Sequence, residues 1–463
     1  MSAKVISLTV ETDGLTPEQL EVATTFAGKN AGICYMKDSY FDSDVSDAVK
    51  AAKRFISTSD TGHHSIADHV NIEVLFEECS KMLAIVLNSL QQYSTSEKSG
   101  RYTKMSGNSE TERDLYNKWK KLFWGRILEI EPNIDDTDIL KKMVKKGYDC
   151  MVENRELQPD GPQLPKEAFD YFDELVNEDE TLPSHKMAQE NARYVLSVFT
   201  KSTSFGYTTS IRQWNYIYDW CNRYCEGYLV DEDGDVVYAS NNNKASYFES
   251  ELYWDLSDLA EFIESTMYVA NLRDYKNRCF NVLCDLSGDE NHPMQDYSIG
   301  EDDNIDMGYC ISYYGSFVQI AQAQRHRTLK YFIKFDPTAD RQYFVPMMIR
   351  NTELEEEWLK DLKTVEEFVP QATRVGIIET GFVGDFVLKC TERLCGRAQW
   401  ETMHQTYQSA KAFLSQKNLS PAYENYMYIL RDHDDEPCTK CKLLGACREA
   451  CRYGADGAFT RQI

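Results

Sequence analysis

Two segments far apart in the chain carry the same pattern of a strand followed by a helix. Residues 69–78 alternate apolar and polar side chains, as a half-buried strand does, and Ser80 then opens an apolar helical stretch that runs to residue 90. Residues 306–314 repeat the strand, and Ser316 opens a second helical stretch that runs to residue 327. Ser89 lies nine residues after Ser80, and Arg325 lies nine residues after Ser316, so the two segments share one register. The repeat predicts two related folding units.

The two segments differ in where they carry polar groups. The second has a basic triplet, R-H-R at 325–327, where the first has S-L-Q at 89–91. The first has Y-S-T-S-E-K-S-G-R-Y at 93–102, whereas the positions matching Glu97, Ser99 and Arg101 are Ile333, Phe335 and Pro337. The simpler alternative is two unrelated strand–helix units, one of which ends in cations that favour the helix dipole.

Joined together, the two halves resemble one run, R-H-R-x-x-S-x-N-E-x-S-x-R-Y, of the flavin-dependent thymidylate synthases. The resemblance implies an α+β fold of two tandem domains of this family, each with an antiparallel sheet and long helices. We expect these domains to form a pseudo-dimer, followed by a Cys-rich tail. The two copies have each kept half of the site, which is the pattern expected of an internal duplication.

The predicted organisation has three parts. The first copy covers residues 1–240 and contains a charged insertion at about 108–184, which we expect to be a helical surface subdomain. A β-hairpin is predicted at 229–238 around Asp233-Gly234, and the three asparagines at 241–243 form the boundary between the copies. The second copy covers 244–430, and the tail covers 431–463.

The resemblance assigns the substrate-binding residues to both copies. In the first copy, it places the nucleotide-binding turn at Glu97, Ser99, Gly100 and Arg101, with Arg193 as a second phosphate contact. A hydroxyl, free backbone N–H groups and a guanidinium suit a phosphate dianion. In the second copy, the family's Q-x-x-R matches Gln322 and Arg325, and Arg393 in T-E-R-L-C-G-R-A-Q-W-E matches the arginine that activates the substrate, where the first copy has Cys221.

The resemblance also implies which residues contact the flavin. From the first copy these are His63, Ser65, Asp68, Ser96 and Arg212; from the second copy they are Arg325, His326 and Arg327. Two of these positions depart from the family, because Asp68 stands where Glu is usual and Ser96 stands where Asn is usual.

The activity implied is methyl transfer from methylenetetrahydrofolate to C5 of dUMP, giving dTMP, with FAD as cofactor and NADPH as reductant. We predict one composite site per chain and Arg393 as the group that polarises the pyrimidine carbonyl. Two alternatives stay open at this point. One is a related C5 modification with a hydroxymethyl or aminomethyl product, and the other is a non-catalytic scaffold built on the duplicated fold.

The amino-acid composition of the chain limits the kinds of molecule that it can bind. The net charge of -25 argues against duplex nucleic acid, because neutralising its phosphates needs a basic surface, but it permits a free nucleotide held by a few arginines. No apolar run reaches the ~18 residues of a membrane helix, and we expect a cytoplasmic protein without membrane contact. The chain is expected to form a homodimer of pseudo-dimeric chains.

Four cysteines lie close together in the tail, with the spacing C-x2-C-x5-C-x3-C: Cys438, Cys441, Cys447 and Cys451. Four thiolates at such spacing suit tetrahedral zinc. An iron–sulfur cluster and ordinary thiols are the alternatives. The resemblance does not extend to this tail, so we expect zinc there to stabilise the fold.

Overall fold

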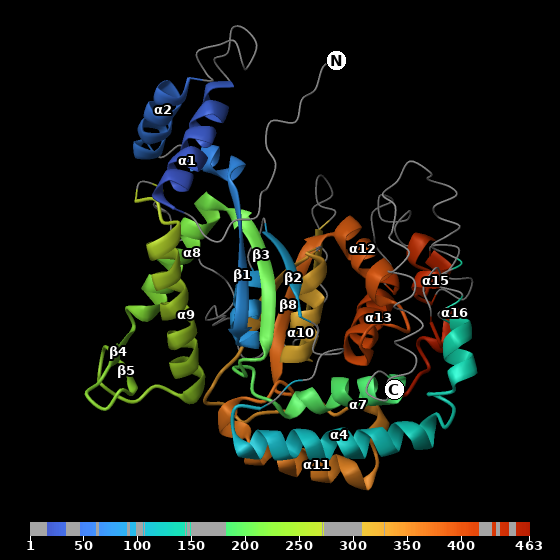
Figure 1. The fold of residues 1–463 in the computed structure, drawn as a ribbon. Helices are drawn as coiled ribbons and strands as arrows, with labels where there is room; N and C mark the ends of the chain where they lie inside the picture. The colour runs from blue at the N-terminus through green and yellow to red at the C-terminus, as the bar shows by residue number, and fades with distance from the viewer. Residues whose placement is uncertain are drawn as a thin grey trace. The chain divides into compact units, whose positions relative to one another are not determined.

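The structure is a computed structural model of the 463-residue chain, and Figure 1 gives its elements. It describes residues 16–33, 47–61, 64–89, 93–98, 105, 107–143, 145, 149, 182–270, 272, 308–327, 329–415, 428–431, 436–443 and 451–463. The chain divides into two compact units. Unit 1 comprises Met1–Phe76, Gln92–Ser96 and Phe205–Phe280, and unit 2 comprises Glu77–Gln91, Glu97–Ser204 and Asn281–Ile463.

Two three-stranded sheets share one strand order. The first has the order β1-β3-β2, with bounds Asn71–Cys79, Thr203–Ser210 and Tyr93–Glu97. The second has the order β6-β8-β7, with bounds Gly308–Ser316, Arg374–Phe382 and Lys330–Lys334, and both of its pairings are antiparallel. In each sheet the strand that comes last in the chain lies in the middle. The α+β class is therefore confirmed, and the shared order supports the predicted duplication, which itself stays a prediction.

The strand–helix repeat predicted from the sequence is present in both places. Ser80 caps α3 (Lys81–Asn88), its side chain accepting a hydrogen bond from the Leu83 amide at 2.9 Å. Ser316 caps α10 (Phe317–Ala323) in the same way. These caps form because a serine hydroxyl satisfies an amide that has no partner within the helix. The second helix continues as the short 3-10 helix η7 (Gln324–His326), and Arg327 ends it in the left-handed region at φ 53°.

Unit 1 contains a helical core. Helices α1 (Pro17–Gly32) and α2 (Ala48–Asp60) cross closely at Gly28, where a Cβ atom would lie 2.0 Å from the Ala51 carbonyl oxygen. The other elements of this unit are η3 (His64–His69), α8 (Ile211–Cys225), α9 (Tyr247–Thr266) and the hairpin β4–β5 (Tyr228–Val230 and Val236–Tyr238). The hairpin confirms the prediction for 229–238, and its turn uses the left-handed φ of Gly234. The buried cluster consists of Ala27, Phe55, Ala67, Val70, Ile211 and Leu272.

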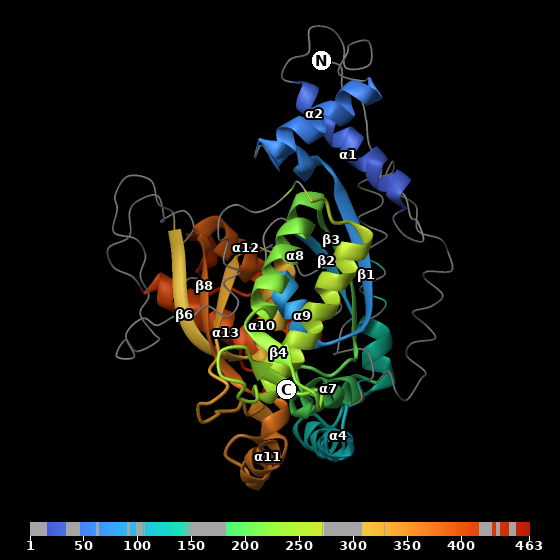
Figure 2. The same ribbon diagram turned by 90° about the vertical axis from the view of Figure 1, so that its left-hand side faces the viewer.

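Unit 2 has a core to which the predicted insertion contributes. Helix α4 (Glu110–Ile130) lies beside α7 (Pro183–Ala192) and α11 (Glu353–Thr364), as both ribbon views show (Figures 1 and 2). Trp119, Phe123 and Ile127 follow one another at four-residue spacing on α4 and are fully buried. Trp119 packs edge-on against Trp358 of the second copy, with ring centroids 4.7 Å apart.

The expectation of a surface subdomain was therefore wrong for the first helix of the insertion. The charged residues of the segment lie on the outer face of α4, whereas the apolar stripe of this helix is part of the core of unit 2. Residues 150–181 of the predicted insertion lie outside the described residues.

Helices α12 (Val383–Arg393) and α13 (Trp400–Leu414) lie beside strands β6 and β8 within unit 2 (Figure 2). The interface contains a fully buried ion pair between Lys389 and Glu379. Glu379 also accepts hydrogen bonds from the Tyr309 and Tyr313 hydroxyls, each at 3.1 Å. Removing a charged group from water costs free energy, and buried charges are therefore paired and hydrogen-bonded in this way.

The two compact units do not coincide with the two predicted copies. The predicted boundary at 241–243 lies inside unit 1, and the division between the units passes through strands β1, β2 and β3. The predicted copies are defined by a repeat in the sequence, whereas the two units are defined by which residues pack together. The predicted domain limits stay predictions.

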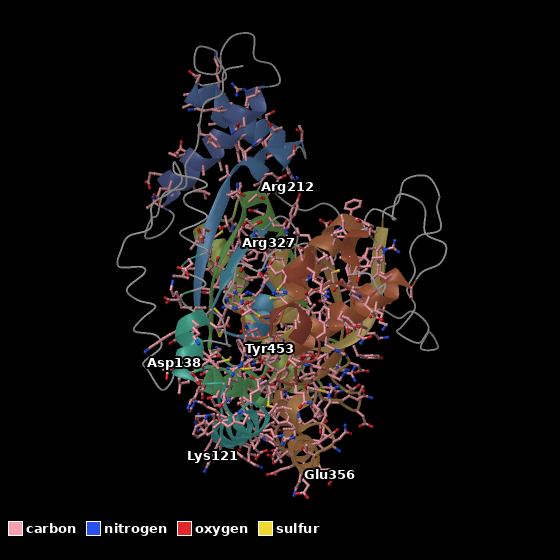
Figure 3. All side chains as sticks on the ribbon, turned by 90° about the vertical axis from the view of Figure 1, so that its right-hand side faces the viewer. Lys121, Asp138, Arg212, Arg327, Glu356 and Tyr453 are labelled. Carbon is pink, nitrogen blue, oxygen red and sulfur yellow. The ribbon has the colours of Figure 1, made fainter. Side chains whose placement is uncertain are left out.

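The burial of α4 leads to a test of stability. We expect Phe123→Ala to lower the free energy of unfolding by about 3–5 kcal/mol, because it leaves a cavity in the core of unit 2. Lys121→Ala, on the exposed side of the same helix (Figure 3), is the matched control and should change it by less than about 0.5 kcal/mol. Chemical denaturation followed by tryptophan fluorescence measures both. Equal stabilities of the two variants would show that α4 is a dispensable surface helix.

Candidate functional site

The predicted site residues fall into three groups. Those in unit 2 are Glu97, Arg193, Gln322, Arg325, His326, Arg327 and Arg393. Those in unit 1 are Ser65, Asp68, Ser96 and Arg212. His63, Ser99, Gly100 and Arg101 lie outside the described residues. Each unit is therefore considered separately.

The two half-motifs meet in unit 2. Arg325, in η7 at the end of the second strand–helix segment, donates a hydrogen bond from Nη2 to the carbonyl oxygen of Glu97 at 2.9 Å. Glu97 is the last residue of β2 in the first copy. The preceding residue of η7 also contacts the predicted first copy, because Gln324 donates from Nε2 to the Ser89 hydroxyl at 2.7 Å. Arg325 and Glu97, one from each half of the motif, therefore lie side by side in unit 2.

The Glu97 carboxylate is buried and has two partners. It pairs with the ammonium group of Lys81, the first residue of α3, and it accepts a hydrogen bond from the Thr203 hydroxyl at 3.3 Å. Burial lowers the pKa of Lys81; the charge of Glu97 opposes this shift, and the nearby charges of Arg193 and Arg325 add to it. Four charged groups therefore lie close together in the interior of unit 2.

Sequence reasoning missed Lys81. The available signal was a lysine directly after the N-cap in the otherwise apolar stretch K-M-L-A-I-V-L, where a charge needs a partner. The sequence alone does not indicate which of the many carboxylates that partner is.

Gln322 and Arg393 also contact each other. Arg393, the last residue of α12, donates from Nη2 to the Gln322 carbonyl oxygen at 2.6 Å, and both residues are buried. The side-chain oxygen of Gln322 has no hydrogen-bond partner among the described residues. Buried amide oxygens are rarely left unsatisfied, so this atom fits a ligand that offers an N–H or O–H group.

The segment that follows Arg393 supports the other groups of the site. Gln399 accepts a hydrogen bond from Arg193 Nη2 at 3.0 Å. Glu401 accepts from the Ser316 amide at 2.9 Å and from its hydroxyl at 2.6 Å, and so reinforces the N-terminus of α10. Burial raises the pKa of Glu401, and its hydrogen bonds with Ser316 and Tyr194 oppose the shift. The A-Q-W-E sequence therefore holds Arg193 and the start of the helix that carries Gln322.

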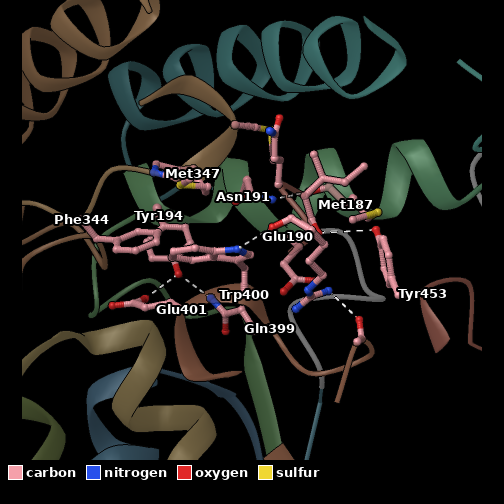
Figure 4. Close-up of a pocket in the computed structure, with 16 residues that line it drawn as sticks. Met187, Glu190, Asn191, Tyr194, Phe344, Met347, Gln399, Trp400, Glu401 and Tyr453 are labelled. Carbon is pink, nitrogen blue, oxygen red and sulfur yellow. Dashed lines mark hydrogen bonds between the residues drawn. The ribbon is translucent and has the colours of Figure 1, made fainter. Parts of the chain in front are cut away.

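A cavity of about 120 Å³ lies beside this segment, within unit 2 (Figure 4). Its wall is mostly aromatic side chains and methionines, and its polar wall includes Tyr194, Gln399 and Glu401. These three groups already bond to one another: the Tyr194 hydroxyl donates to Glu401 at 2.7 Å and accepts from the Gln399 amide. None of the predicted site residues lines this cavity, and we assign no ligand to it.

Unit 1 brings together two of the predicted flavin contacts. Arg212, on α8, donates from Nη1 to the Asp68 carboxylate at 2.7 Å and from Nε to the Tyr216 hydroxyl at 2.6 Å. Asp68 also accepts from the Ser210 hydroxyl at 3.0 Å. The side chains of Arg212 and Asp68 are 21% and 35% exposed, so a ligand can reach them. Ser65 and Ser96, the other predicted flavin contacts described in this unit, are exposed.

The Cys-rich tail is described only in part. Cys438 is buried and Cys441 and Cys451 are half-buried, whereas Cys447 lies outside the described residues. The Lys440 amide donates to the Leu394 carbonyl at 2.6 Å, which joins the tail to the residue after Arg393. Within the described part of the chain, no three His, Cys, Asp or Glu side chains are placed to hold a metal ion. The four-cysteine site stays a prediction.

Metal analysis tests that prediction. We expect about one zinc ion per chain, and a chelator should remove it and lower the melting temperature, because metal binding stabilises the folded tail. Cys441→Ser should lower the zinc content, while Cys225→Ser, in unit 1, is the control that leaves it unchanged. A protein without zinc or iron would show that the tail cysteines are ordinary thiols.

The comparisons with known proteins concern the first part of the chain. Residues 22–224 match the family model described as Thymidylate synthase complementing protein. Among proteins with curated descriptions, none matches the chain. In the part of the chain that the structure describes, no helix combines the length and the apolar character needed to cross a membrane.

The matched residues begin in α1, end in α8 and include Lys81, Glu97 and Arg193. Over residues 22–224, the chain is therefore similar to the flavin-dependent thymidylate synthases.

Proposed function

We propose that this protein transfers a methyl group from methylenetetrahydrofolate to C5 of dUMP, giving dTMP, at one composite site built from both copies. The observation that carries the proposal is the hydrogen bond from Arg325 to the Glu97 carbonyl, because it joins the two halves of the family's motif. The family match over residues 22–224 supports the class of reaction.

The charges of unit 2 suit a nucleotide monophosphate. Arg193, Arg325 and Arg393 supply guanidinium groups, and Lys81 compensates the charge of the Glu97 carboxylate. A local excess of positive charge inside an acidic chain binds a small anion without providing the extended basic surface that nucleic acid requires. We propose that the turn at Ser99–Arg101 completes the phosphate site.

Two groups of the second copy suit the pyrimidine ring. The unsatisfied side-chain oxygen of Gln322 is an acceptor for a ring N–H, and the buried guanidinium of Arg393 is a donor for a ring carbonyl. Negative charge develops on the carbonyl oxygens when C5 becomes nucleophilic. A donor already fixed by its bond to the Gln322 backbone stabilises that charge without reorganisation.

We propose that Asp68, Arg212, Ser65 and Ser96 of unit 1, and the R-H-R triplet of unit 2, hold FAD. The half-buried Arg212–Asp68 pair fits this role, because it presents a guanidinium and a carboxylate to a polar ligand. When bound, the reduced flavin supplies the hydride that completes the methyl group, and NADPH reduces it. The protein residues bind and orient the substrates and polarise the pyrimidine.

The full chain, purified and incubated with dUMP, methylenetetrahydrofolate, FAD and NADPH, tests the proposal. The expected results are the visible spectrum of a bound flavin and a nucleotide product with the mass of dTMP. A product with the mass of a hydroxymethyl or aminomethyl nucleotide would show that the protein catalyses another C5 modification instead of methyl transfer. Absence of both flavin and product would contradict an enzyme of this class.

We expect Arg393→Ala to lower kcat by at least about 100-fold, the typical loss of one preorganised donor, while bound flavin remains. Leu388→Ala is the control, since Leu388 lies on the exposed side of the same helix, α12. Steady-state kinetics and the flavin spectrum of both variants provide the measurement. If Arg393→Ala kept more than about a tenth of the wild-type rate, Arg393 would not be the polarising group.

The composite site also predicts stoichiometry and behaviour on mixing. We expect one flavin and one nucleotide per chain, because each copy supplies only half of the motif. Inactive Arg101→Ala protein mixed with inactive Arg325→Ala protein should stay inactive under subunit exchange, because each site draws both halves from one chain. Wild-type protein carried through the same exchange is the control. Recovered activity would show that the site is shared between chains, and two flavins per chain would contradict the composite site.

A further inference from the structure

The ion pair between Lys81 and Glu97 is deeply buried for a pair of charged residues. The two side chains are 11% and 2% exposed. Taking two charges out of water costs several kcal/mol per ion, and replacing such a pair with apolar side chains of similar size is often neutral or stabilising. The fold alone therefore gives little reason to keep these charges.

At the equivalent positions of the second strand–helix segment, the chain has two apolar residues instead of this ion pair. In the shared register of the repeat, set by the N-cap residues Ser80 and Ser316, Lys81 corresponds to Phe317 and Glu97 corresponds to Ile333. Phe317 and Ile333 are both fully buried. The same strand–helix arrangement thus forms with two apolar residues, so the charges in the first copy serve something other than folding.

Glu97 links Lys81 to the predicted nucleotide site. Its carboxylate binds Lys81, and its carbonyl oxygen accepts the hydrogen bond from Arg325. The next amide, of Lys98, donates to the Ser204 carbonyl at 2.8 Å, which fixes the end of β2. Because one residue makes both contacts, holding the Glu97 side chain also holds the carbonyl that orients the Arg325 guanidinium.

The pair also determines the local charge. Arg193 and Arg325 are near enough to Lys81 to act on it electrostatically. Without Lys81, the buried Glu97 carboxylate would take Arg325 as its counter-charge, and a bound phosphate would compete with Glu97 for that guanidinium.

We infer that Lys81 is a positioning residue of the nucleotide site: by pairing with Glu97 it orients Arg325 and leaves the charge of Arg325 to the phosphate of the substrate. The inference rests on the proposed function, since it takes dUMP as the ligand. It assigns a specific role to a residue that the two half-motifs do not contain.

The decisive variant gives positions 81 and 97 the residues that the second strand–helix segment has at the equivalent positions. The double variant Lys81→Phe with Glu97→Ile should unfold cooperatively, with a denaturation midpoint no lower than that of the wild type. Its affinity for dUMP, measured by calorimetry on the flavin-loaded full chain, should fall by at least about tenfold. The reason is that Arg325 is no longer held in its orientation and that the positive charge of Lys81 is removed. A double variant that folds and binds dUMP within about twofold of the wild type would overturn the inference.

A second pair of variants tests the inference if the double variant does not fold. Lys81→Arg keeps a cation beside Glu97 and should bind dUMP within about threefold of the wild type, whereas Lys81→Gln should lose at least about tenfold. Equal affinities of these two variants would overturn the role of Lys81. A wild-type protein that does not bind dUMP would instead refute the proposed function, and with it the ligand on which the inference depends.

Discussion

The hydrogen bond from the Arg325 guanidinium to the Glu97 carbonyl is the contact on which the organisation of the site depends. It connects residues 228 positions apart, one from each of the two repeated segments. A backbone carbonyl is an acceptor that substitution of the side chain does not remove, so the contact depends on the path of β2. The path of β2 is fixed in turn by the buried carboxylate of the same residue and by the amide that follows it.

The two predicted copies carry charged residues at different matched positions. Where the predicted first copy has the buried Cys221, the predicted second copy has Arg393, and where the second has the buried Ile333, the first has Glu97. Burying an apolar side chain at such a position costs less free energy than burying a charged one, because a buried charge needs a partner. The fold therefore accepts apolar residues at Cys221 and Ile333.

Much of the fold could be predicted from the sequence because the patterns that specify it are local. Alternation predicts β1 and β6, the serine caps predict α3 and α10, and Asp233-Gly234 predicts the hairpin. The partner of Lys81 and the burial of α4 could not be predicted, since each depends on a residue distant in sequence. The motif predicted the residues of the site, whereas the contacts of Gln322, Arg393 and Arg193 required the three-dimensional structure.

The core of unit 2 is shared between the two predicted copies. Trp119, Phe123 and Tyr194 come from the first copy, whereas Trp358, Phe344 and Val318 come from the second, and all belong to one buried cluster. Either copy alone would expose large aromatic side chains to water, at a cost of about 1.5–3 kcal/mol for each. A cut between the two predicted copies would therefore expose this core unless the two pieces stayed together.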